Sequence, residues 1–587
     1  MLKTVNSLVN KDQRALTAFL VFLFGIVFLS TDLLYDPFHT PKNLVLIIAG
    51  CVIIPIIFIL NFKFKSPLND SFRLDFIGVL MLLRIIYLVA SHPHPIKNIE
   101  ITLLVLVSLF VIYKTGYVMR TNTIERVVNR LCYTLFMSGL ILSIIGFFQF
   151  FQSLSVTDQA IKTTVIGTFG SPNAFGNWLG LSLLSGIFVA KNSQKKWVPL
   201  IGITIITVCL ILSKSRGAVL AVLASLVVIY LVKRKRTILP YVSIGIFILI
   251  AGLLLSLIDI NSTTGRLYIW QISLQMLKDN FLTGIGIGNF GNEFLDYQGR
   301  FLTENPDFPS SKAAFIRSPH NEFLQGFIEG GIIGGGIFIA ITISHFVNLF
   351  SNLKNGKSEK DLILLGLSVI LVVHALIDSI FHFTPQLVLF YFLVGLSNRK
   401  KIFQIKLKTY ITIPFLIILM VFSSFVVYKN IMGRYYWKKG MRYSESAMFS
   451  LSIPYFEKSL KYIEYGELYF HYGAALVHNN NSRRGLYFLD KATETFLDKN
   501  IPLTESVAYN QAGKFKKAIE KADRVLFYYP DLLAPHLLKA ESYYRLGEFD
   551  NSKIELLKCI NEETGIKSPD TKQIAKEASA LWIEYGY

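Results

Sequence analysis

The sequence predicts an all-α protein, a polytopic membrane helix bundle of about 13 spans followed by a soluble helical-repeat domain. The 587 residues are 52% hydrophobic and only 17% charged, which is too apolar for a soluble chain of this length. Apolar windows of bilayer length recur as far as residue 430, and beyond it charged and aromatic residues interleave at helical spacing. We therefore expect a membrane domain over residues 1–430 and a repeat domain over residues 431–587.

Each predicted span is a window of about twenty apolar residues, the length of helix that crosses a bilayer core. The windows lie near 15–33, 43–61, 74–91, 100–115, 131–152, 174–190, 197–213, 217–232, 239–258, 322–348, 361–380, 384–397 and 409–428. The two shortest, 100–115 and 384–397, also fit re-entrant segments. A polar loop of about sixty residues, 259–320, separates the ninth window from the tenth.

Lys and Arg in the short loops predict the orientation, because these residues accumulate on the cytoplasmic side. They are frequent near 3–14, 63–73, 114–130, 191–196, 233–236, 354–360 and 399–408. The opposite loops hold little beyond Lys42, Lys97, Lys162, Lys214 and Arg216. We therefore expect a cytoplasmic N-terminus and, with an odd number of spans, an extracytoplasmic C-terminal domain. The same distribution accounts for the net charge of +20, so no nucleic-acid partner is expected.

The C-terminal region repeats itself at an offset of 34 residues. Tyr509, Gly513 and Phe515 recur as Tyr543, Gly547 and Phe549, and Pro530 closes the first unit. This period, with glycine at a tight turn between helices, resembles a tetratricopeptide repeat. Residues 469–492 fit a degenerate earlier unit. A generic helical-hairpin domain is the alternative, and a repeat would indicate a protein partner without naming one.

Polar residues gather where the predicted spans meet the outer face. Ser213–Gly217 forms a tight turn between two spans, Arg266 begins the long outer loop, and His320-Asn321 ends it. Asn173 lies in another outer loop, just before a span. Gly286, Gly288 and Gly291 match the dinucleotide-binding pattern in letters, yet no strand precedes them, so only a phosphate-holding nest of amides is retained for this loop. Four cysteines, three of them in predicted spans, indicate neither a disulfide framework nor a zinc site.

In this order and sidedness the motifs resemble the O-antigen ligase/polymerase superfamily, often called the Wzy_C type, over roughly residues 160–395. The similarity is carried by the Ser-Arg-Gly turn at 215–217, Arg266, His320-Asn321, the glycine pattern of Glu329, Gly331 and Gly334, and the downstream His374, Asp378 and Pro385.

The resemblance implies a GT-C-like membrane glycosyltransferase that uses neither metal nor cofactor. A glycan on undecaprenyl diphosphate would move to an acceptor hydroxyl at the outer face of a bacterial inner membrane, in contact with membrane lipids. A lipid A core acceptor would make the protein a ligase. A growing glycan would make it a polymerase, and a protein acceptor an oligosaccharyltransferase, and all three stay open.

The chemistry of these side chains suggests their roles. Guanidinium groups match diphosphate oxygens with permanently charged donors, so Arg216 and Arg266 are the candidates for diphosphate binding. A neutral imidazole accepts a hydroxyl proton near physiological pH, so His320 is the candidate general base. Asn321, Lys214 and Asn173 are candidate supporting residues.

Each assignment has an alternative. Arg216 also fits an interfacial lipid anchor, Arg266 a loop salt bridge with Asp259 or Asp279, and His320 a helix-start residue bonded to backbone. His374 and Asp378, four residues apart, are predicted to be a structural pair on one helix face. A solute transporter, with Arg84 and Asp378 lining its path, is the alternative function of another class.

Overall fold

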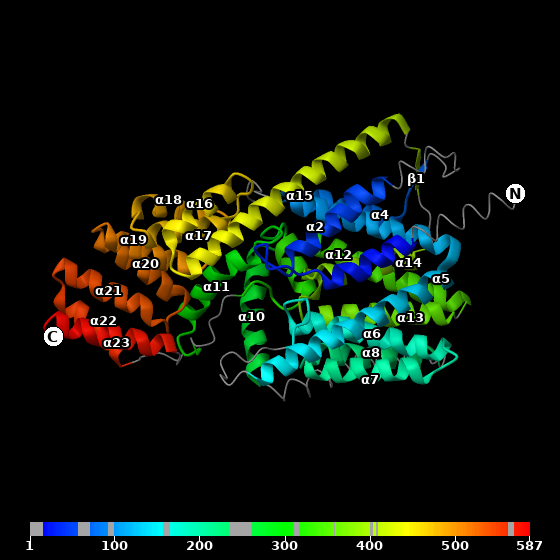
Figure 1. Cartoon of the computed structure of the whole chain (residues 1–587), viewed down its shortest axis with the longest axis horizontal. Coiled ribbons are helices and arrows are strands. Elements are labelled where there is room, and N and C mark those ends of the chain that lie inside the picture. The colour runs from blue at the N-terminus through cyan, green and yellow to red at the C-terminus, as the bar shows by residue number, and fades with distance from the viewer. Residues whose placement is uncertain are drawn as a thin grey trace.

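The computed structural model describes residues 16–56, 71–91, 99–155, 165–233, 260–309, 316–356, 358–398, 403–406, 409–561 and 569–587. Figure 1 shows a helical bundle on the right, crossed at its left end by helix α10, with a stack of shorter helices beyond it. The all-α prediction is confirmed, apart from one small sheet in which β1 (Ser71–Leu74) pairs antiparallel with β2 (Phe403–Lys406).

The bundle contains apolar helices that match twelve of the thirteen predicted spans, and the window 239–258 lies outside the described residues. They are Leu16–Phe28, α2 (Thr40–Ile48) continued by the π-helical η1 (Ala49–Ile53), α4 (Phe76–Ala90), α5 (Ile99–Leu154), α6 (Pro172–Asn192), α7 (Trp197–Leu212), α8 (Arg216–Lys233), α12 (Glu322–Gly356), α13 (Glu359–Ala375), α14 (Thr384–Ser397) and α15 (Thr409–Glu445).

The span count is lower than predicted. Among the described residues, six helical stretches are long and apolar enough to cross a membrane, and five more are apolar but shorter. The remaining helix that matches a window, α13, belongs to neither group and begins with the charged residues Glu359, Lys360 and Asp361. Two predicted spans, 100–115 and 131–152, lie in the single 56-residue helix α5 as successive apolar stretches, Ile99–Arg120 and Ile124–Leu154. The polar residues between them carry no proline or glycine, so nothing in the covalent chain interrupts the helix there.

Contacts among the Lys- and Arg-rich loops place these loops on one face of the bundle, as the charge pattern requires. The β1–β2 pair joins the loop before α4 to the loop before α15. Lys191 pairs with Glu359 across two other such loops, and Lys360 lies 2.6 Å from Glu125. Inside this face, the buried Arg120 is 3.3 Å from Asp361.

The predicted outer loop is mostly helical. α10 (Ile260–Asp279) lies across the end of the bundle, and α11 (Phe290–Glu304) follows it toward the shorter helices (Figure 1). Tyr268, Ile272 and Met276 of α10 pack with Phe290 and Phe294 of α11 in a core of their own. This loop is therefore a folded layer between the membrane bundle and the C-terminal region.

The C-terminal region is a stack of helical hairpins, which confirms the predicted helical repeat. After α15 come α16 (Phe449–Leu460), α17 (Gly466–His478), α18 (Ser482–Thr493), α19 (Asn500–Gln511), α20 (Phe515–Tyr528), α21 (Leu533–Leu546), α22 (Phe549–Ile560) and α23 (Pro569–Glu584). Four hairpin turns each place one residue in the left-handed conformation: Ala447, Asn480, Gly513 and Gly547, spaced 33, 33 and 34 residues apart.

The four turns share one hydrogen bond, from the amide after the left-handed residue to the carbonyl five residues earlier. The distances are 2.9 Å for Met448 to Tyr443, 2.8 Å for Asn481 to Leu476, 2.8 Å for Lys514 to Tyr509 and 2.9 Å for Glu548 to Tyr543. This is the pattern of a Schellman cap, which explains why glycine stands at two of the turns. The first repeat begins within α15, so the last apolar helix runs unbroken past residue 430 into the repeats.

The repeats pack on α11 of the outer loop. Gln298 donates to the carbonyl of Tyr528 over 3.1 Å, and Asn292 exchanges bonds with Thr495 and Leu497. Gly299 lies so close to Phe527 that an added Cβ would be 2.2 Å from its ring. Because α11 is joined to the segment that carries His320, this interface ties the repeats to the candidate site.

Candidate functional site

The structure pairs the His320 imidazole with a carboxylate that lies 58 residues away in the sequence. Nδ1 of His320 is 2.9 Å from Oδ1 of Asp378. The histidine side chain is 37% exposed and the aspartate 11%, so the carboxylate supports an imidazole that substrate can reach. If Nδ1 carries the proton and donates to Asp378, Nε2 is the proton acceptor.

The backbone around His320 is held from both sides. His320 has a φ of 51°, an uncommon conformation for a residue with a side chain. Nε1 of Trp270, on α10, donates to the carbonyl of Pro319 over 2.8 Å. On the other side, Oδ1 of Asn321 accepts bonds of 3.0 Å from the amides of Phe323 and Leu324. Asn321 is therefore the N-cap of α12, a role that orients the histidine through the backbone.

Asp378 lies in a short irregular segment between α13 and α14, where α13 has already ended at Ala375. Its Oδ1 also accepts from the amide of Ser379 over 2.8 Å. Glu322, in the first turn of α12, accepts from the amide of Phe381 over 2.6 Å. His374 and Asp378 interact electrostatically, and the amide of Asp378 donates to the carbonyl of His374 over 2.9 Å. They do not share a helix face as predicted, because α13 ends between them and the Asp378 side chain contacts His320.

His374 connects the pair to the Ser-Arg-Gly turn. Its Nδ1 is 3.0 Å from the side-chain nitrogen of Asn177, on α6. Gly217 packs so closely that an added Cβ would lie 2.8 Å from Nε2 of His374. Arg216 is the neighbour of Gly217 and the first residue of α8, so the turn brings this guanidinium to the same end of the bundle.

Arg266 lies on α10, which crosses this end of the bundle. Its charge acts on both Asp378 and His374. The alternative pairing with Asp279 is not found, since Asp279 interacts with Gln275 and Tyr297, and Asp259 lies outside the described residues. The structure thus gathers Arg266, His320, Asp378 and His374 from α10, the loop before α12 and the end of α13.

Lys214 and Asn173 form the turn and its support. Lys214 is exposed with a φ of 55°, which lets the chain reverse between α7 and α8. Oγ of Ser215 donates to Oδ1 of Asn173 over 3.2 Å, and Ser215 also packs on Gly176 of α6. Asn173 therefore holds the turn that carries Arg216.

The glycine-rich loop docks on a kink in α12. Gly331 interrupts α12 with φ 60° and ψ −168°. The amides of Ile285 and Gly286 donate to the carbonyls of Ile328 and Glu329 at 2.9 and 3.0 Å. A Cβ on Gly331 would be 2.2 Å from the carbonyl oxygen of Leu282, so this approach requires glycine. The amide of Gly288 bonds the Glu329 carboxylate, so the anion that this loop holds here is the protein's own.

Arg84 lies apart from this site, inside the bundle on α4. It donates to the hydroxyl of Tyr391 over 3.1 Å, and its guanidinium is 4.5 Å from the ring of Phe338. Glu322 is near enough to interact with it electrostatically. Arg84 therefore has partners inside the bundle, a tyrosine hydroxyl and an aromatic ring.

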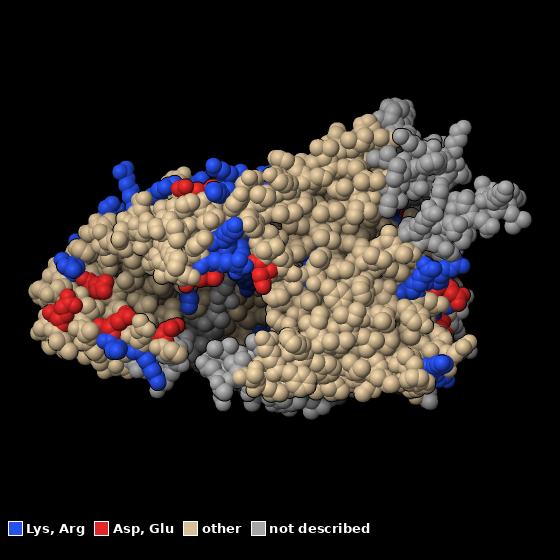
Figure 2. Space-filling view, viewed as in Figure 1, with Lys and Arg blue, Asp and Glu red and all other residues tan. Residues whose placement is uncertain are grey.

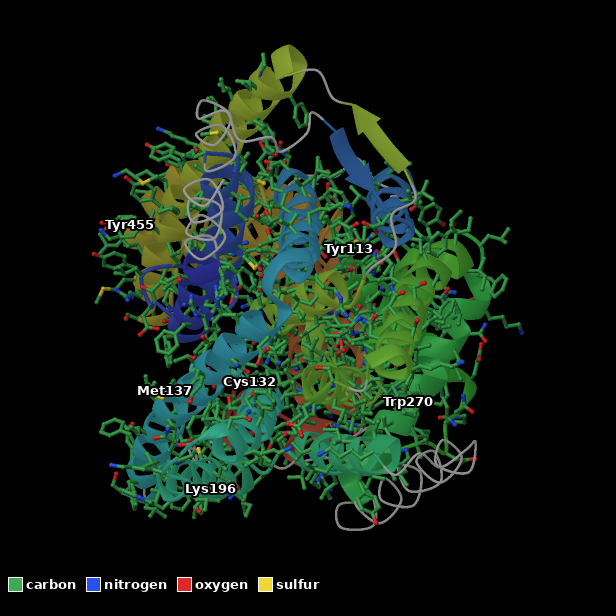
Figure 3. The ribbon with its side chains drawn as sticks, turned by 90° about the vertical axis from the view of Figure 1, so that its right-hand side faces the viewer. Tyr113, Cys132, Met137, Lys196, Trp270 and Tyr455 are labelled. Atoms are coloured by element: carbon green, nitrogen blue, oxygen red, sulfur yellow. The ribbon has the colours of Figure 1, made fainter. Side chains whose placement is uncertain are left out.

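The surface has two separate hollow regions. Figure 2 shows a hollow between the repeats and the bundle. A separate cavity of about 560 Å³ opens between the helix Leu16–Phe28 and α5, lined by apolar side chains that include Met137. Met137 and Trp270, which bonds beside His320, lie on opposite sides of Figure 3. That cavity is therefore not part of the candidate site.

Three carboxylates or imidazoles around His320 were not predicted as site residues, although Glu329 belongs to the glycine pattern of the family resemblance. Glu322 and Glu329 are buried near the start of α12, and His382 lies close enough to His320, Asp378 and Glu329 to interact with them. A carboxylate within an apolar helix is itself a signal of function, and it was present at Glu329. Within the described residues, no group of three His, Cys, Asp or Glu side chains is placed to hold a metal ion.

Comparison with known proteins agrees with the resemblance seen in the motifs. Residues 200–339 match the family model described as O-antigen ligase. A search of curated proteins found no match. Among solved structures, the crystal structure of the APC/C hetero-tetramer Cut9-Hcn1 is similar at 10% identity, over 80% of this chain and 76% of that chain, with a TM-score of 0.23.

The matched stretch contains Arg216, Arg266 and His320 and ends before Asp378. Together with the apolar helices it indicates a multi-pass protein of the bacterial inner membrane. Residues 200–339 are thus similar to the O-antigen ligase family, and they lie in a helix bundle that continues into C-terminal helical repeats.

Proposed function

We propose that this protein is a membrane glycosyltransferase that moves a glycan from undecaprenyl diphosphate to an acceptor hydroxyl at the outer face of the inner membrane. The observation that carries the proposal is the contact of 2.9 Å between His320 and Asp378, with the charge of Arg266 acting on the same aspartate. A base with an orienting carboxylate and a fixed cation nearby is the arrangement that transfer from a diphosphate requires.

In this proposal His320 takes the proton of the acceptor hydroxyl through Nε2 as the hydroxyl oxygen attacks the anomeric carbon. The bond between that carbon and the diphosphate oxygen breaks, and both electrons leave with the lipid diphosphate. Asp378 holds the imidazole by Nδ1 and stabilises the imidazolium that forms. The positive charge of the His320 imidazolium is thus balanced by the Asp378 carboxylate, next to the leaving diphosphate.

Arg216 and Arg266 are proposed to bind the diphosphate. Guanidinium groups supply paired N–H donors that match its oxygens, and they remain charged when water is excluded. These two cations take the role that a divalent metal has in other glycosyl transfers, so the proposed reaction is independent of metal. Lys214 and Asn173 support the turn that presents Arg216.

The proposal includes the orientation of the protein in the membrane. The Lys- and Arg-rich face of the bundle, with the β1–β2 pair, is cytoplasmic, and α10, α11 and the repeats are extracytoplasmic. We assign residues 1–430 to the membrane domain, with 160–395 as its ligase-like core and 259–320 as its outer loop, and residues 431–587 to the repeat domain. The N-terminus is then cytoplasmic and the C-terminus periplasmic.

The test is a comparison of surface glycans by gel in a deletion strain that carries each variant. His320→Ala and Arg266→Ala should each abolish transfer while the protein still inserts in the membrane. Loss of all capped lipopolysaccharide in these strains identifies a ligase. Accumulation of single-repeat caps identifies a polymerase, and a change confined to glycoprotein staining identifies a protein oligosaccharyltransferase. A normal ladder with either variant removes that residue from the mechanism.

Arg84 distinguishes glycan transfer from the alternative function, solute transport. A transport path would need this half-buried arginine, whereas transfer at the outer face does not involve it. Arg84→Gln in the same strain should therefore leave glycan transfer intact. Loss of the surface glycan with Arg84→Gln but not with His320→Ala would favour transport.

A further inference from the structure

A band of tyrosine and lysine side chains covers the first hairpin of the repeat region, away from the candidate site. We call it the tyrosine-lysine stripe, made of Tyr436, Lys439 and Tyr443 of α15, Tyr455 and Lys458 of α16, and Tyr462 just beyond α16. All six side chains are at least partly exposed. Tyr455 lies at the margin of the molecule in Figure 3, far from Trp270 beside the site.

The rings and cations of the stripe form one continuous surface across the two helices. Tyr443 stacks on Tyr455 with ring centroids 5.3 Å apart, and Tyr436 stacks on Tyr462 at 6.0 Å. Lys458 lies 5.6 Å from the Tyr455 ring and 5.9 Å from the Tyr436 ring, which joins the two stacked pairs. Lys439 lies 5.8 Å from the Tyr455 ring.

The stripe is also the most basic part of the C-terminal region. Residues 428–462 contain seven Lys or Arg, two Glu and six Tyr. Residues 463–587 contain sixteen Lys or Arg and eighteen Asp or Glu, so the excess of positive charge is confined to the first hairpin. Of the two acids in the hairpin, Glu457 is already bound by Tyr472 and Arg484. The surface is therefore complementary to an anion.

The stripe starts at the bilayer surface and continues away from it. The apolar part of α15 ends near Tyr428, and Tyr443 follows about 22 Å farther along the helix at 1.5 Å per residue. The polar headgroup layer is only about 6 Å thick on each side of the core. Lipid headgroups therefore account for the Tyr428 end, while Lys439, Tyr443 and Tyr455 extend beyond them.

We propose that the tyrosine-lysine stripe binds an anionic polysaccharide that is anchored in the membrane by its lipid. A glycan attached to a lipid begins at the headgroups and extends outward, as the stripe does. The negative face of a tyrosine ring attracts the C–H groups of a sugar ring, and the lysines pair with carboxylate or phosphate groups on the chain. The inference rests on the proposed function for the source of the glycan, and it makes the stripe a holding site outside the catalytic centre.

The test measures binding of oligogalacturonate, a carboxylated sugar chain, to the full-length protein in phosphatidylcholine nanodiscs. The wild type should bind it with a salt-dependent affinity and should not bind neutral dextran of equal length. Lys439→Gln with Lys458→Gln should weaken binding roughly tenfold, since two exposed charges are lost. Tyr443→Leu with Tyr455→Leu should also weaken the binding of oligogalacturonate, although this variant keeps the net charge of the wild type.

The matched control removes two lysines elsewhere in the repeats. Lys514→Gln with Lys516→Gln has the same net charge as the first variant and also lies on exposed surface, and it should bind like the wild type. Equal losses in both double variants, or no binding by the wild type, would overturn the proposal. The proposal would also fail if the lysine variant changed the interaction of the protein with phosphatidylglycerol in the nanodiscs and left its affinity for oligogalacturonate unchanged. That result would assign the stripe to lipid headgroups.

Binding of oligogalacturonate by the stripe should be independent of catalysis. His320→Ala should bind oligogalacturonate as the wild type does, even though it is expected to lose transfer. If His320→Ala transfers normally while the stripe variants still lose binding, the proposed mechanism fails and the stripe stands. If transfer depends on His320 but the stripe variants bind normally, the stripe fails alone.

Discussion

The candidate site and the repeat region hold their polar side chains in different ways. At the site, partners come from distant parts of the chain: His320 meets Asp378, and Asn177 meets His374 across 197 residues. In the repeats, partners are near in sequence, as in the turn bonds from Lys514 to Tyr509 and from Glu548 to Tyr543. The repeats are therefore a regular scaffold built from short-range contacts, whereas the site exists only through the packing of the whole bundle.

The two regions meet at α11 and in the loops around it. Arg317, three residues before His320, is 3.2 Å from Glu467 of α17, and Glu467 also accepts a bond from Tyr35. Tyr35 stacks on Trp437 of α15 with ring centroids 3.7 Å apart. The scaffold therefore holds two loops at the outer end of the bundle, one of which leads directly into His320.

The largest expected effect is at the site itself. Asp378→Asn should reduce the rate of glycan transfer roughly 10³-fold, because the amide no longer holds Nδ1–H of His320 and the imidazole loses its orientation. The rate is measured with purified protein and a lipid-linked donor. Asn321→Ala is the matched control, since it removes only the helix cap and should cost far less. Equal rates for Asp378→Asn and the wild type would show that the Asp378 carboxylate takes no part in the reaction.

The second effect concerns pH and the contact between Tyr35 and the repeats. Burial lowers the pKa of His471 from 6.5 to about 4, and its Nε2 lies 3.3 Å from the hydroxyl of Tyr35. Above about pH 6.5 the imidazole is neutral in both folded and unfolded chains. Below it the unfolded chain takes up the proton first, so stability is lost as the pH falls, by about 3 kcal/mol in total.

Thermal unfolding of the full chain at a series of pH values measures this loss. His471→Gln cannot titrate, so its stability should change less between pH 6.5 and 4 than that of the wild type. The difference between the two proteins isolates His471 from the many carboxylates that also titrate in acid. Parallel curves for both would show that this histidine does not contribute.

The third effect tests the kink in α12. Gly331→Ala should destabilise the protein by roughly 2 kcal/mol, because the residue has a positive φ and its Cβ would meet the Leu282 carbonyl. Gly336→Ala lies in the same helix with open space around it and should be neutral or slightly stabilising. Unfolding temperatures in one detergent compare the two. Equal behaviour of both variants would mean that the glycine loop does not dock on the kink.

The smallest effect is expected at the interface between α11 and the repeats. Arg524 lies 2.5 Å from Asp296, with both side chains partly exposed, so each single substitution should cost less than about 1 kcal/mol. Asp296→Arg and Arg524→Asp should each destabilise the protein, and the exchanged pair should recover part of the loss. A double-mutant cycle on unfolding temperature measures this coupling. Additive losses in the exchanged pair would show that the two charges do not interact.

Sequence patterns predicted most of the architecture because they depend on local physics. Apolar windows became helices, and the recurrence of Gly513 at Gly547 became two equivalent hairpin turns. The turn at Asn480 lies in the unit predicted over residues 469–492, and the turn at Ala447 was not predicted because it takes the same left-handed conformation without glycine. The span count was too high among the described residues, since a window of bilayer-length hydropathy does not measure where a helix ends, and five of the apolar helices are shorter than a full span.

The site was predicted in part. His320, Arg216 and Arg266 were singled out by residue type and place along the chain, and the structure brings them to one end of the bundle. The pairing of His320 with Asp378 was not predicted, because the spacing of four residues suggested that Asp378 shares a helix face with His374, and the helix ends before Asp378. Asn321 and Asn173 were expected to support the site, and in the structure Asn321 caps α12 through backbone amides while Asn173 accepts a hydrogen bond from the Ser215 hydroxyl.

The amino-acid sequence by itself determined which segments are apolar helices, which loops share a face and where the repeats turn, because these follow from hydrophobic length, charge and backbone preference over short stretches. The tertiary structure alone decided that Asp378 faces His320, that Gly217 brings the Ser-Arg-Gly turn to His374 and that α11 is held by the repeats. Those contacts join residues separated by many tens of positions, and only the close packing of several helices brings them within bonding distance.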